Sequence, residues 1–213
     1  MASTKTQSRT KGRASLPVAG ERTERADAAR NRERIVKAAR RLIGRKGVRA
    51  ITLDDVAEEA GVARATLFRR FPDRGALLLA LLDEHERALQ DAILEGDPPL
   101  GPGAPPAKRL AAFAEALHDL TLEHRELLLG SETTAPLARM RTGAYAFWHI
   151  HLAALLRELR PDADPDVLAD LILALYDAEL QQFLADERDA KTARLLLLDS
   201  VRRLAGVRRR PGG

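Results

Sequence analysis

The stretch GVARATLFRRFPDRGALL, residues 61–78, concentrates side chains that could bind a polyanion. Arg64, Arg69 and Arg70 fall within seven consecutive positions, together with a threonine and a phenylalanine. A guanidinium group can form paired hydrogen bonds with guanine or phosphate, and threonine can bind phosphate or contact a thymine methyl group. The same charge run could be an ordinary solvated helix face, so the surrounding elements have to distinguish the two.

Those surrounding elements predict a helix-turn-helix. Apolar residues at helical spacing indicate a first helix over 27–46, ended by a glycine suited to a left-handed cap. A second helix opens at Thr52, whose side chain can cap it, and Asp55 favours the positive helix end. Gly61 then allows a tight turn into a third short helix over 63–71.

Helical spacing divides the third helix into an inner and an outer face. Val62, Leu67 and Phe71 fall on the inner side, toward the first two helices. The outer surface is then expected to carry Arg64, Ala65, Thr66, Phe68, Arg69 and Arg70. A capped helix, a glycine turn and a basic outer face together favour insertion into the major groove of DNA.

The charge of the chain is unevenly distributed. Residues 1–75 hold 19 Lys and Arg against 9 Asp and Glu, a balance of +10, whereas residues 76–213 hold 16 against 22, a balance of −6. Such an asymmetry suggests that the basic part meets a polyanion, which could be nucleic acid or an anionic membrane surface. Because the helix-turn-helix pattern favours DNA, we expect double-stranded DNA as a partner and no membrane.

Composition favours a soluble protein of the cytoplasm. Hydrophobic residues make up 45% of the chain and charged residues 31%, and there is no cysteine for disulfides or thiolate metal sites. The longest apolar runs, such as 76–82, are far shorter than the ~18 residues of a membrane span. The first twenty residues lack the apolar segment of a secretory signal.

The rest of the chain also follows helical periodicity, so we predict an all-α protein. A fourth helix over 74–94 precedes the Pro- and Gly-rich loop 96–106, and no segment shows sustained strand alternation. Further helices are predicted over 107–122, 123–130, 135–159, 165–185 and 188–205.

Residues 30–82, RNRERIVKAARRLIGRKGVRAITLDDVAEEAGVARATLFRRFPDRGALLLALL, resemble the N-terminal domain of the tetracycline-repressor (TetR) family of bacterial transcriptional regulators. The matching motifs are RIVKAARRLIGRKG, ITLDDVAEEAGVARATLFRRF and FPDRGALL, in about a quarter of the chain. The resemblance implies a three-helix DNA-binding domain, a linking helix, and a helical C-terminal domain for ligand binding and dimerisation. The expected domains are a disordered basic arm (1–25), the helix-turn-helix domain (26–75), the ligand-binding and dimerisation domain (76–207) and a basic tail (208–213).

The resemblance also implies roles for individual residues. Thr52 matches the residue that bonds a backbone phosphate at the start of the second helix, and Arg74 matches a phosphate-contacting lysine. The recognition-helix positions correspond to Arg64, Ala65, Thr66, Arg69 and Arg70. Phe68 replaces the usual tyrosine and so lacks its phosphate-bonding hydroxyl, and Ala63 replaces the usual serine cap. The arm before the first helix either adds phosphate or minor-groove contacts or is a tail without a role.

The C-terminal half offers a possible lining for an effector, an unknown small molecule. Aromatic and Met side chains at helical spacing are more often plain core, so polar groups on apolar faces, which need a hydrogen-bonding partner, are the sharper candidates. The candidate lining residues are Phe113, Leu117, His118, Met140, Tyr145, Trp148, His149, Leu152, Tyr176, Leu180, Gln181 and Phe183.

Two apolar stripes near the C-terminus predict a homodimer. They belong to the last long helices, and the run LLLL at 195–198 is apolar almost all round. The candidate interface residues are Leu168, Leu171, Ile172, Leu175, Leu195, Leu198 and Val201. Two heads about one helical turn apart, ~34–36 Å, would then bind a palindromic operator.

An enzyme fits the sequence poorly. His149 and His151 are two residues apart on a predicted helix and point to different faces, which does not suit a shared metal ion. No glycine-rich phosphate loop and no Ser/His/Asp grouping is recognisable, so no catalytic residue, metal or cofactor is expected. The leading hypothesis is a ligand-responsive DNA-binding regulator, most simply a repressor. The alternatives are a helical protein that uses its basic N-terminal half on an anionic membrane or as an interaction adaptor, and a small helical enzyme.

Overall fold

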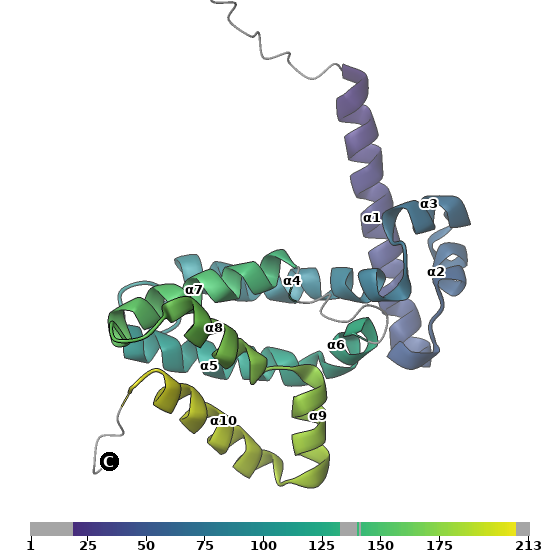
Figure 1. Ribbon diagram of the computed structural model, residues 1–213. Helices are drawn as coiled ribbons and strands as arrows, with labels where there is room; N and C mark the ends of the chain where they lie inside the picture. The colour runs from purple at the N-terminus through teal and green to yellow at the C-terminus, as the bar shows by residue number, and fades with distance from the viewer. Residues whose placement is uncertain (1–18, 133–139, 141, 208–213) are drawn as a thin grey trace, which may run out of the picture.

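The computed structural model of the protein describes residues 19–132, 140 and 142–207. Within these ranges the chain forms ten α-helices and a short 3-10 helix, η1, without a strand, which confirms the all-α prediction (Figure 1). None of these helices combines the length and the apolar character needed to cross a membrane. The elements are α1 (Ala19–Lys46), η1 (Val48–Ala50), α2 (Leu53–Ala60), α3 (Arg64–Arg70), α4 (Arg74–Glu95), α5 (Pro106–Glu123), α6 (Arg125–Glu132), α7 (Gly143–Leu159), α8 (Pro165–Ala174), α9 (Ala178–Glu187) and α10 (Ala190–Leu204).

The elements α1, η1, α2 and α3, which we call the head, enclose a small apolar core. Ile35 of α1, Val56 of α2 and Leu67 of α3 are fully buried in it. Leu77 and Leu78 from the first turns of α4 complete this core. In Figure 1 the N-terminal half of α1 projects beyond α2 and α3, which pack beside its lower part.

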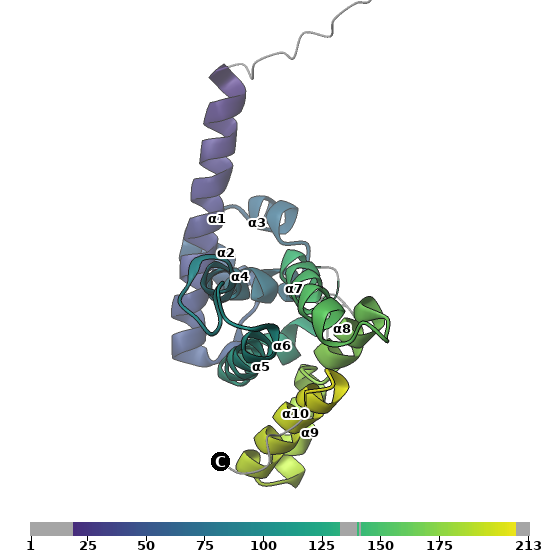
Figure 2. The same cartoon turned by 90° about the vertical axis from the view of Figure 1, so that its left-hand side faces the viewer.

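The helices α5 to α10, which we call the body, contain a second core, to which α5, α7, α8 and α10 contribute. Phe113, Trp148 and Tyr176 are its largest side chains, and all three are buried. Helix α4 belongs to both cores, since Leu89 and Ile93 near its end pack into the body. Helices α4, α5 and α7 lie side by side, whereas α9 and α10 lie on the opposite side of the body from α3 (Figures 1 and 2). A continuous α4 therefore connects the head mechanically to the body.

The first helix begins earlier than its apolar period predicts. Helix α1 starts at Ala19, so residues 19–25 are helical and do not belong to a disordered arm. The segment AGERTERADAAR consists mainly of Ala, Glu and Arg, which favour a helix without an apolar face. The remaining arm residues, 1–18, and the predicted tail, 208–213, lie outside the described residues.

The predicted helix over 165–185 is two helices, α8 and α9. Asp177 caps α9 by accepting a hydrogen bond from the Leu180 amide at 2.9 Å. The Tyr176 amide donates to the Leu173 carbonyl, three residues earlier, at 3.0 Å. Such an i to i−3 bond is typical of the last turn of a helix. This turn buries the Tyr176 ring, whose hydroxyl donates to the Ala114 carbonyl of α5 at 3.0 Å. The predicted helix over 135–159 begins at Gly143 in the described residues, and 133–139 are outside them.

Candidate nucleic-acid interface

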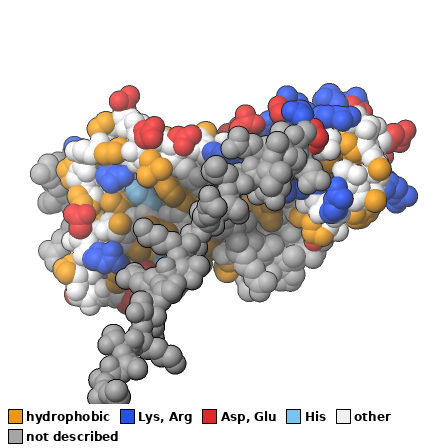
Figure 3. Space-filling model, turned by 90° about the horizontal axis from the view of Figure 1, so that it is seen from above, with side chains coloured by type: hydrophobic (Ala, Val, Ile, Leu, Met, Phe, Trp, Pro, Cys, Tyr) orange, Lys and Arg blue, Asp and Glu red, His pale blue; other side chains and the backbone are white. Residues whose placement is uncertain are grey.

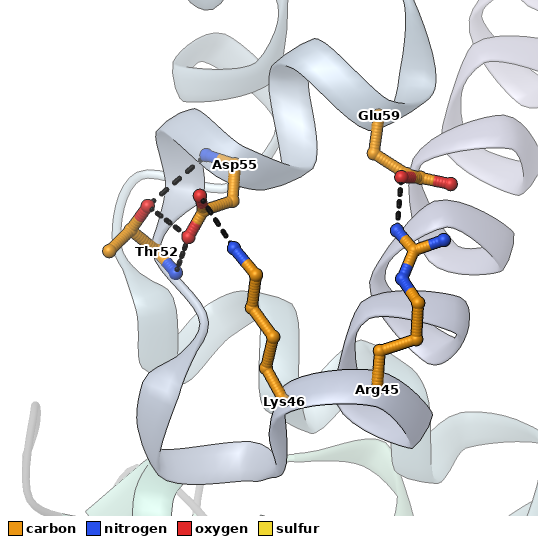
Figure 4. Close-up of polar contacts among 5 residues, drawn as sticks. All are labelled: Arg45, Lys46, Thr52, Asp55 and Glu59. Atoms are coloured by element: carbon orange, nitrogen blue, oxygen red, sulfur yellow. Dashed lines mark hydrogen bonds and ion pairs between the residues drawn. The ribbon is translucent and has the colours of Figure 1, made fainter.

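Reciprocal side-chain to backbone bonds fix the start of α2 (Figure 4). The Asp55 amide donates to Thr52 Oγ1 at 3.1 Å, and the Thr52 amide donates to Asp55 Oδ2 at 3.0 Å. The Thr52 hydroxyl donates to the same carboxylate at 2.8 Å, and Lys46 Nζ lies 3.2 Å from the other oxygen. The bonds from Thr52, with a smaller effect of Lys46, lower the pKa of Asp55 and keep it ionised. This capping box holds α2 at a defined angle to the end of α1.

Ion pairs and a backbone contact tie the other end of α2 to α1. Glu59 accepts a hydrogen bond from Arg41 Nε at 2.9 Å and forms a second, short ion pair with Arg45 (Figure 4). Hydrogen bonds from the two arginines lower the pKa of the Glu59 carboxyl. Arg34 donates to the Ala60 carbonyl at 2.8 Å, at the end of α2. Arg34 is not among the sequence candidates, although its position one residue before the buried Ile35 places it beside the head core.

The turn between α2 and α3 requires glycine at position 61. Gly61 has φ 61° and ψ 41°, the left-handed conformation that side-chain-bearing residues adopt at a cost. Its amide donates to Glu58 O at 3.0 Å, and the Val62 amide donates to Ala57 O at 3.0 Å. These bonds satisfy the last carbonyls of α2 and turn the chain sharply into α3.

Helix α3 presents the two faces that its spacing predicts. Leu67 and Phe71 are 0% and 4% exposed and hold the helix in the head core. Thr66 is half-buried, facing α1, so it is less open than the sequence suggests. The residues exposed on the outer side are Arg64, Ala65, Phe68, Arg69 and Arg70.

The three arginines of α3 differ in their local partners. Arg64 forms an ion pair with Asp54 of α2 at 2.5 Å. Arg69 and Arg70 have no ion pair or hydrogen bond with any residue that the structure describes. They flank a hollow of about 170 Å³ between α3 and α1, lined by Ala28, Asn31, Arg32, Ile35, Thr66, Arg69 and Arg70. Arg69 and Arg70 are therefore the freest cations on the exposed side of α3.

Side chains of α1 enlarge this basic surface beyond the predicted residues. Asn31 and Arg32 line the hollow beside α3, although Arg32 also pairs with Asp83 of α4. In the view from above, Lys and Arg side chains gather at the end of the molecule formed by the head (Figure 3). Asn31 and Arg32 are not among the sequence candidates, which lie in the N-terminal arm, the second and third helices and the start of the fourth. Their signal is helical spacing, since Asn31 and Arg32 lie seven residues before the buried Ala38 and Ala39 and so continue the inward-facing side of α1.

Arg74 lies between structural elements and does not project freely outward. Its Nη2 donates to the Val48 carbonyl of η1 at 2.6 Å, and its Nε is buried without a partner among the described residues. The resemblance implies that Arg74 contacts a phosphate, which would require this guanidinium to leave Val48. The described contact instead ties η1 to the first turn of α4.

Replacing Thr52 by alanine should lower the free energy of unfolding by about 1 kcal/mol, because loss of an N-cap leaves helix amides without a partner. Thermal or urea unfolding followed by circular dichroism measures this change. Thr66→Ala is the matched control, since α3 has no side-chain cap and Thr66 makes no capping bond. Equal stability of the two variants would contradict the role of the capping box.

Seven of the twelve predicted lining residues are buried, and they fall into three groups. Phe113, Leu117, Trp148 and Leu152 are buried core residues between α5 and α7. Tyr176 and Gln181 are also buried, but each has a backbone acceptor, the carbonyls of Ala114 and Leu175 respectively. His118 is buried, and neither ring nitrogen has a hydrogen-bond partner among the described residues.

The other five predicted lining residues are half-buried or exposed. Tyr145 and His149 are half-buried at the contact of α7 with α8. The Tyr145 hydroxyl donates to Asp170 Oδ1 at 3.2 Å, and His149 Nε2 lies 3.4 Å from the same oxygen. Large fractions of the other three side chains are exposed, so their assignment to an interior lining is corrected. They are Met140, Leu180 and Phe183, at 48%, 38% and 58% exposure. Helical spacing could not reveal this, because it does not say which apolar stripe a neighbouring helix covers.

The predicted dimer face is also divided by the structure. Ile172 and Val201 are buried in the body core, so they are unavailable to a second chain unless the core opens. Leu168, Leu175 and Leu198 are half-buried against the same core. Leu171 and Leu195 remain exposed on α8 and α10, together with Val167 and Leu196, which are not among the candidate interface residues.

The short capped α2, the glycine turn and the basic α3 form the geometry of a helix-turn-helix DNA-binding domain. Residues 35–81 match the protein family described as bacterial regulatory proteins, tetR family. The N-terminal part of the chain therefore contains the DNA-binding domain of this family, and solved structures share the fold along most of the chain's length.

Curated relatives match a limited part of the chain. It is 45% identical over 53 residues to YvkB of Bacillus subtilis, an uncharacterized HTH-type transcriptional regulator, covering 25% of this chain and 28% of YvkB. It is 39% identical over 66 residues to the HTH-type transcriptional regulator TtgR of Pseudomonas putida, covering 30% of this chain and 31% of TtgR. The match thus spans about three tenths of the length of these relatives.

Solved structures match most of the chain. A putative transcriptional regulator from Saccharomonospora viridis, solved with choline, is 26% identical and aligns over 81% of this chain and 96% of its own, with TM-score 0.55. The TetR-family repressor FadR of Thermus thermophilus, solved with lauroyl-CoA, is 24% identical and aligns over 85% and 100%, with TM-score 0.60. The family and these relatives are transcriptional regulators and not enzymes.

Proposed function

We propose that the protein is a homodimeric, sequence-specific DNA-binding repressor that a small molecule releases from a palindromic operator. The observation that carries this proposal is the outer face of α3. On that face Arg69 and Arg70 are exposed and have no partner among the described residues, while Leu67 and Phe71 anchor the helix from behind. Two guanidinium groups without a described partner, on an anchored helix, suit guanine edges or phosphates in the major groove.

The pairing of Arg64 refines its part in this proposal. Its ion pair with Asp54 has both side chains largely exposed, so the pair contributes little and can exchange for a phosphate at small cost. In the free protein the pair holds Arg64 near the start of α3 and partly neutralises it. Arg69 and Arg70 therefore carry the larger share of the attraction to DNA.

A second copy of the chain would cover the exposed apolar residues of α8 and α10. These two helices contact one another, and together they expose Val167, Leu171, Leu195 and Leu196 to between 51% and 62%. Large apolar side chains gathered on neighbouring elements mark association surfaces in soluble proteins. Pairing two bodies through this face provides the two heads that a palindrome needs.

Substituting both Leu171 and Leu195 by glutamate should turn the dimer into a monomer, because each dimer interface would bury carboxylates without partners. The monomer should then bind a DNA fragment with two half-sites more weakly. Size-exclusion chromatography with light scattering at micromolar concentration measures the mass. The matched control replaces Leu94 of α4 and Leu122 of α5, both of which are exposed, by glutamate. A monomeric wild-type protein would contradict the two-headed proposal.

Helix α6 supports the proposed coupling between body and head. Gly130 lets α6 approach α4 so closely that a Cβ atom there would lie 2.6 Å from Leu78 Cδ1. Leu82, Leu128 and Ala178 pack together between α4, α6 and α9, and α6 also contacts η1. A ligand that binds one arrangement of the body more tightly would shift α6 and α4, and with them the head.

The test of the proposed function is a gel shift with a DNA fragment from near the protein's own gene. Specific binding should exceed binding to random DNA by at least ~10³-fold. Equal affinity for the two DNAs would refute a specific regulator and leave only nonspecific attraction of a basic head.

A further inference from the structure

A group of aromatic and basic side chains lies where α4, α5 and α7 meet. Phe113 of α5 packs against two rings of α7, with its centroid 5.9 Å from that of Trp148 and 5.2 Å from that of His151. Arg109, one turn earlier on α5, reaches the end of α4 and donates to the Ile93 carbonyl at 3.3 Å. Helices α4, α5 and α7 lie side by side in this part of the body (Figure 1).

Three polar atoms of this group are buried without a hydrogen-bond partner among the described residues. They are Arg109 Nε, Trp148 Nε1 and His151 Nε2. The Trp148 side chain is 1% exposed, so its N–H cannot be satisfied by bulk water. Leaving buried polar groups unpaired costs free energy, and native proteins rarely collect several of them in one place without a ligand or ordered water.

The charges around the group select the kind of ligand. Arg109 forms no ion pair with a carboxylate in the part of the chain that the structure describes. The first turn of α5, which contains Arg109, has no acidic residue and no side-chain cap, so the positive end of the helix adds to the positive charge there. Burial and then the positive charge of Arg109 lower the pKa of His151 to about 4, so its imidazole is neutral at physiological pH. The group therefore combines an uncompensated cation with two neutral ring nitrogens.

The available hydrogen-bonding groups are mainly donors. An arginine Nε and an indole nitrogen can only donate, and a neutral imidazole can donate from Nε2 when its proton is placed there. A carboxylate oxygen can accept from each of these donors, and its negative charge balances Arg109. A neutral amide of the same shape offers a single acceptor oxygen and no charge.

We propose that Arg109, Trp148 and His151 bind the carboxylate of a small organic acid, whose apolar part lies against Phe113. This inference rests on the proposed ligand-responsive function and assigns a chemical class to its effector. Because Arg109 also contacts the last turn of α4, a bound carboxylate competes with the Ile93 carbonyl for that guanidinium. Binding would thus change a contact of the helix that links the body to the head.

The chain has a single tryptophan, Trp148, so its fluorescence reports directly on this site. Titration of the full-length protein with benzoate should give a saturable change in emission, and the uncharged isostere benzamide should bind at least about tenfold more weakly. Arg109→Gln should weaken benzoate binding about tenfold to hundredfold, the loss expected for a hydrogen bond to a charged group. The matched control, Lys108→Gln, removes an exposed cation from the same helical turn and should leave binding unchanged.

Several outcomes would overturn the carboxylate site. These are equal binding of benzoate and benzamide, full benzoate affinity in Arg109→Gln, and no saturable change with either benzoate or hexanoate. If Arg109→Gln fails to fold by circular dichroism, Trp148→Phe, read by calorimetry, provides the second test and should also weaken benzoate binding. A parallel gel shift separates the carboxylate site from the proposed function. If the protein binds specific DNA but no carboxylate, only the carboxylate site is overturned. If it binds carboxylate but no specific DNA, only the proposed function is overturned.

Discussion

Replacing both Arg69 and Arg70 by alanine is expected to weaken binding to the specific DNA site by at least about a hundredfold. Each arginine contact to a base edge contributes roughly 1–3 kcal/mol, and a factor of ten corresponds to about 1.4 kcal/mol. Neither side chain has a partner among the described residues, so removing it breaks no described bond of the head. The loss should therefore appear in DNA affinity and leave the unfolding temperature nearly unchanged.

Titration of labelled DNA at several salt concentrations measures both parts of this effect. If either arginine binds phosphate, the slope of log affinity against log salt should fall by about 1 for each arginine–phosphate pair that the substitution removes. The matched control replaces Arg157 and Arg188, exposed arginines of the body, by alanine. Undiminished affinity of the Arg69 and Arg70 double variant would remove α3 from the DNA interface.

Replacing Leu67 by alanine is expected to destabilise the head by about 2–5 kcal/mol, the range for emptying a buried leucine site. Leu67 is completely buried and holds α3 against α1 and α2. Because the body has its own core, its helices should remain folded while α3 loses its place. DNA binding should consequently fall even though all three arginines of α3 remain.

Hydrogen exchange resolves this prediction by region, with faster exchange expected in α2 and α3 than in α5 and α7. Leu94→Ala is the control, since Leu94 is 56% exposed at the end of α4 and should cost little. Uniformly accelerated exchange in head and body would show that the two cores unfold together. Unchanged exchange in α3 would show that Leu67 does not anchor it.

The helix-turn-helix could be predicted from sequence because its determinants are local. Thr52 and Asp55 are three residues apart and cap α2 by themselves, and Gly61 supplies the left-handed turn at the position where one is needed. The inner placement of Leu67 and Phe71 follows from helical period alone. Such features depend on neighbours in the chain and so do not require knowledge of the rest of the fold.

Contacts between distant segments were beyond the reach of the same reasoning. The ion pair of Arg64 with Asp54 depends on the angle of the turn, and the bond from Arg74 to Val48 depends on how α4 leaves the head. The carboxylate site joins Arg109 to His151 across two helices, and sequence spacing assigns His151 no partner.

Selection of binding sites from a pool of random DNA by the wild-type protein tests the central claim most directly. A two-headed regulator that reads DNA through α3 should enrich an inverted repeat whose half-sites are about 10–10.5 base pairs apart, or a multiple of that spacing. The half-sites should contain guanines whose enrichment weakens when Arg69 or Arg70 is replaced. Enrichment of no sequence, or of a single site without two-fold symmetry, would contradict the account.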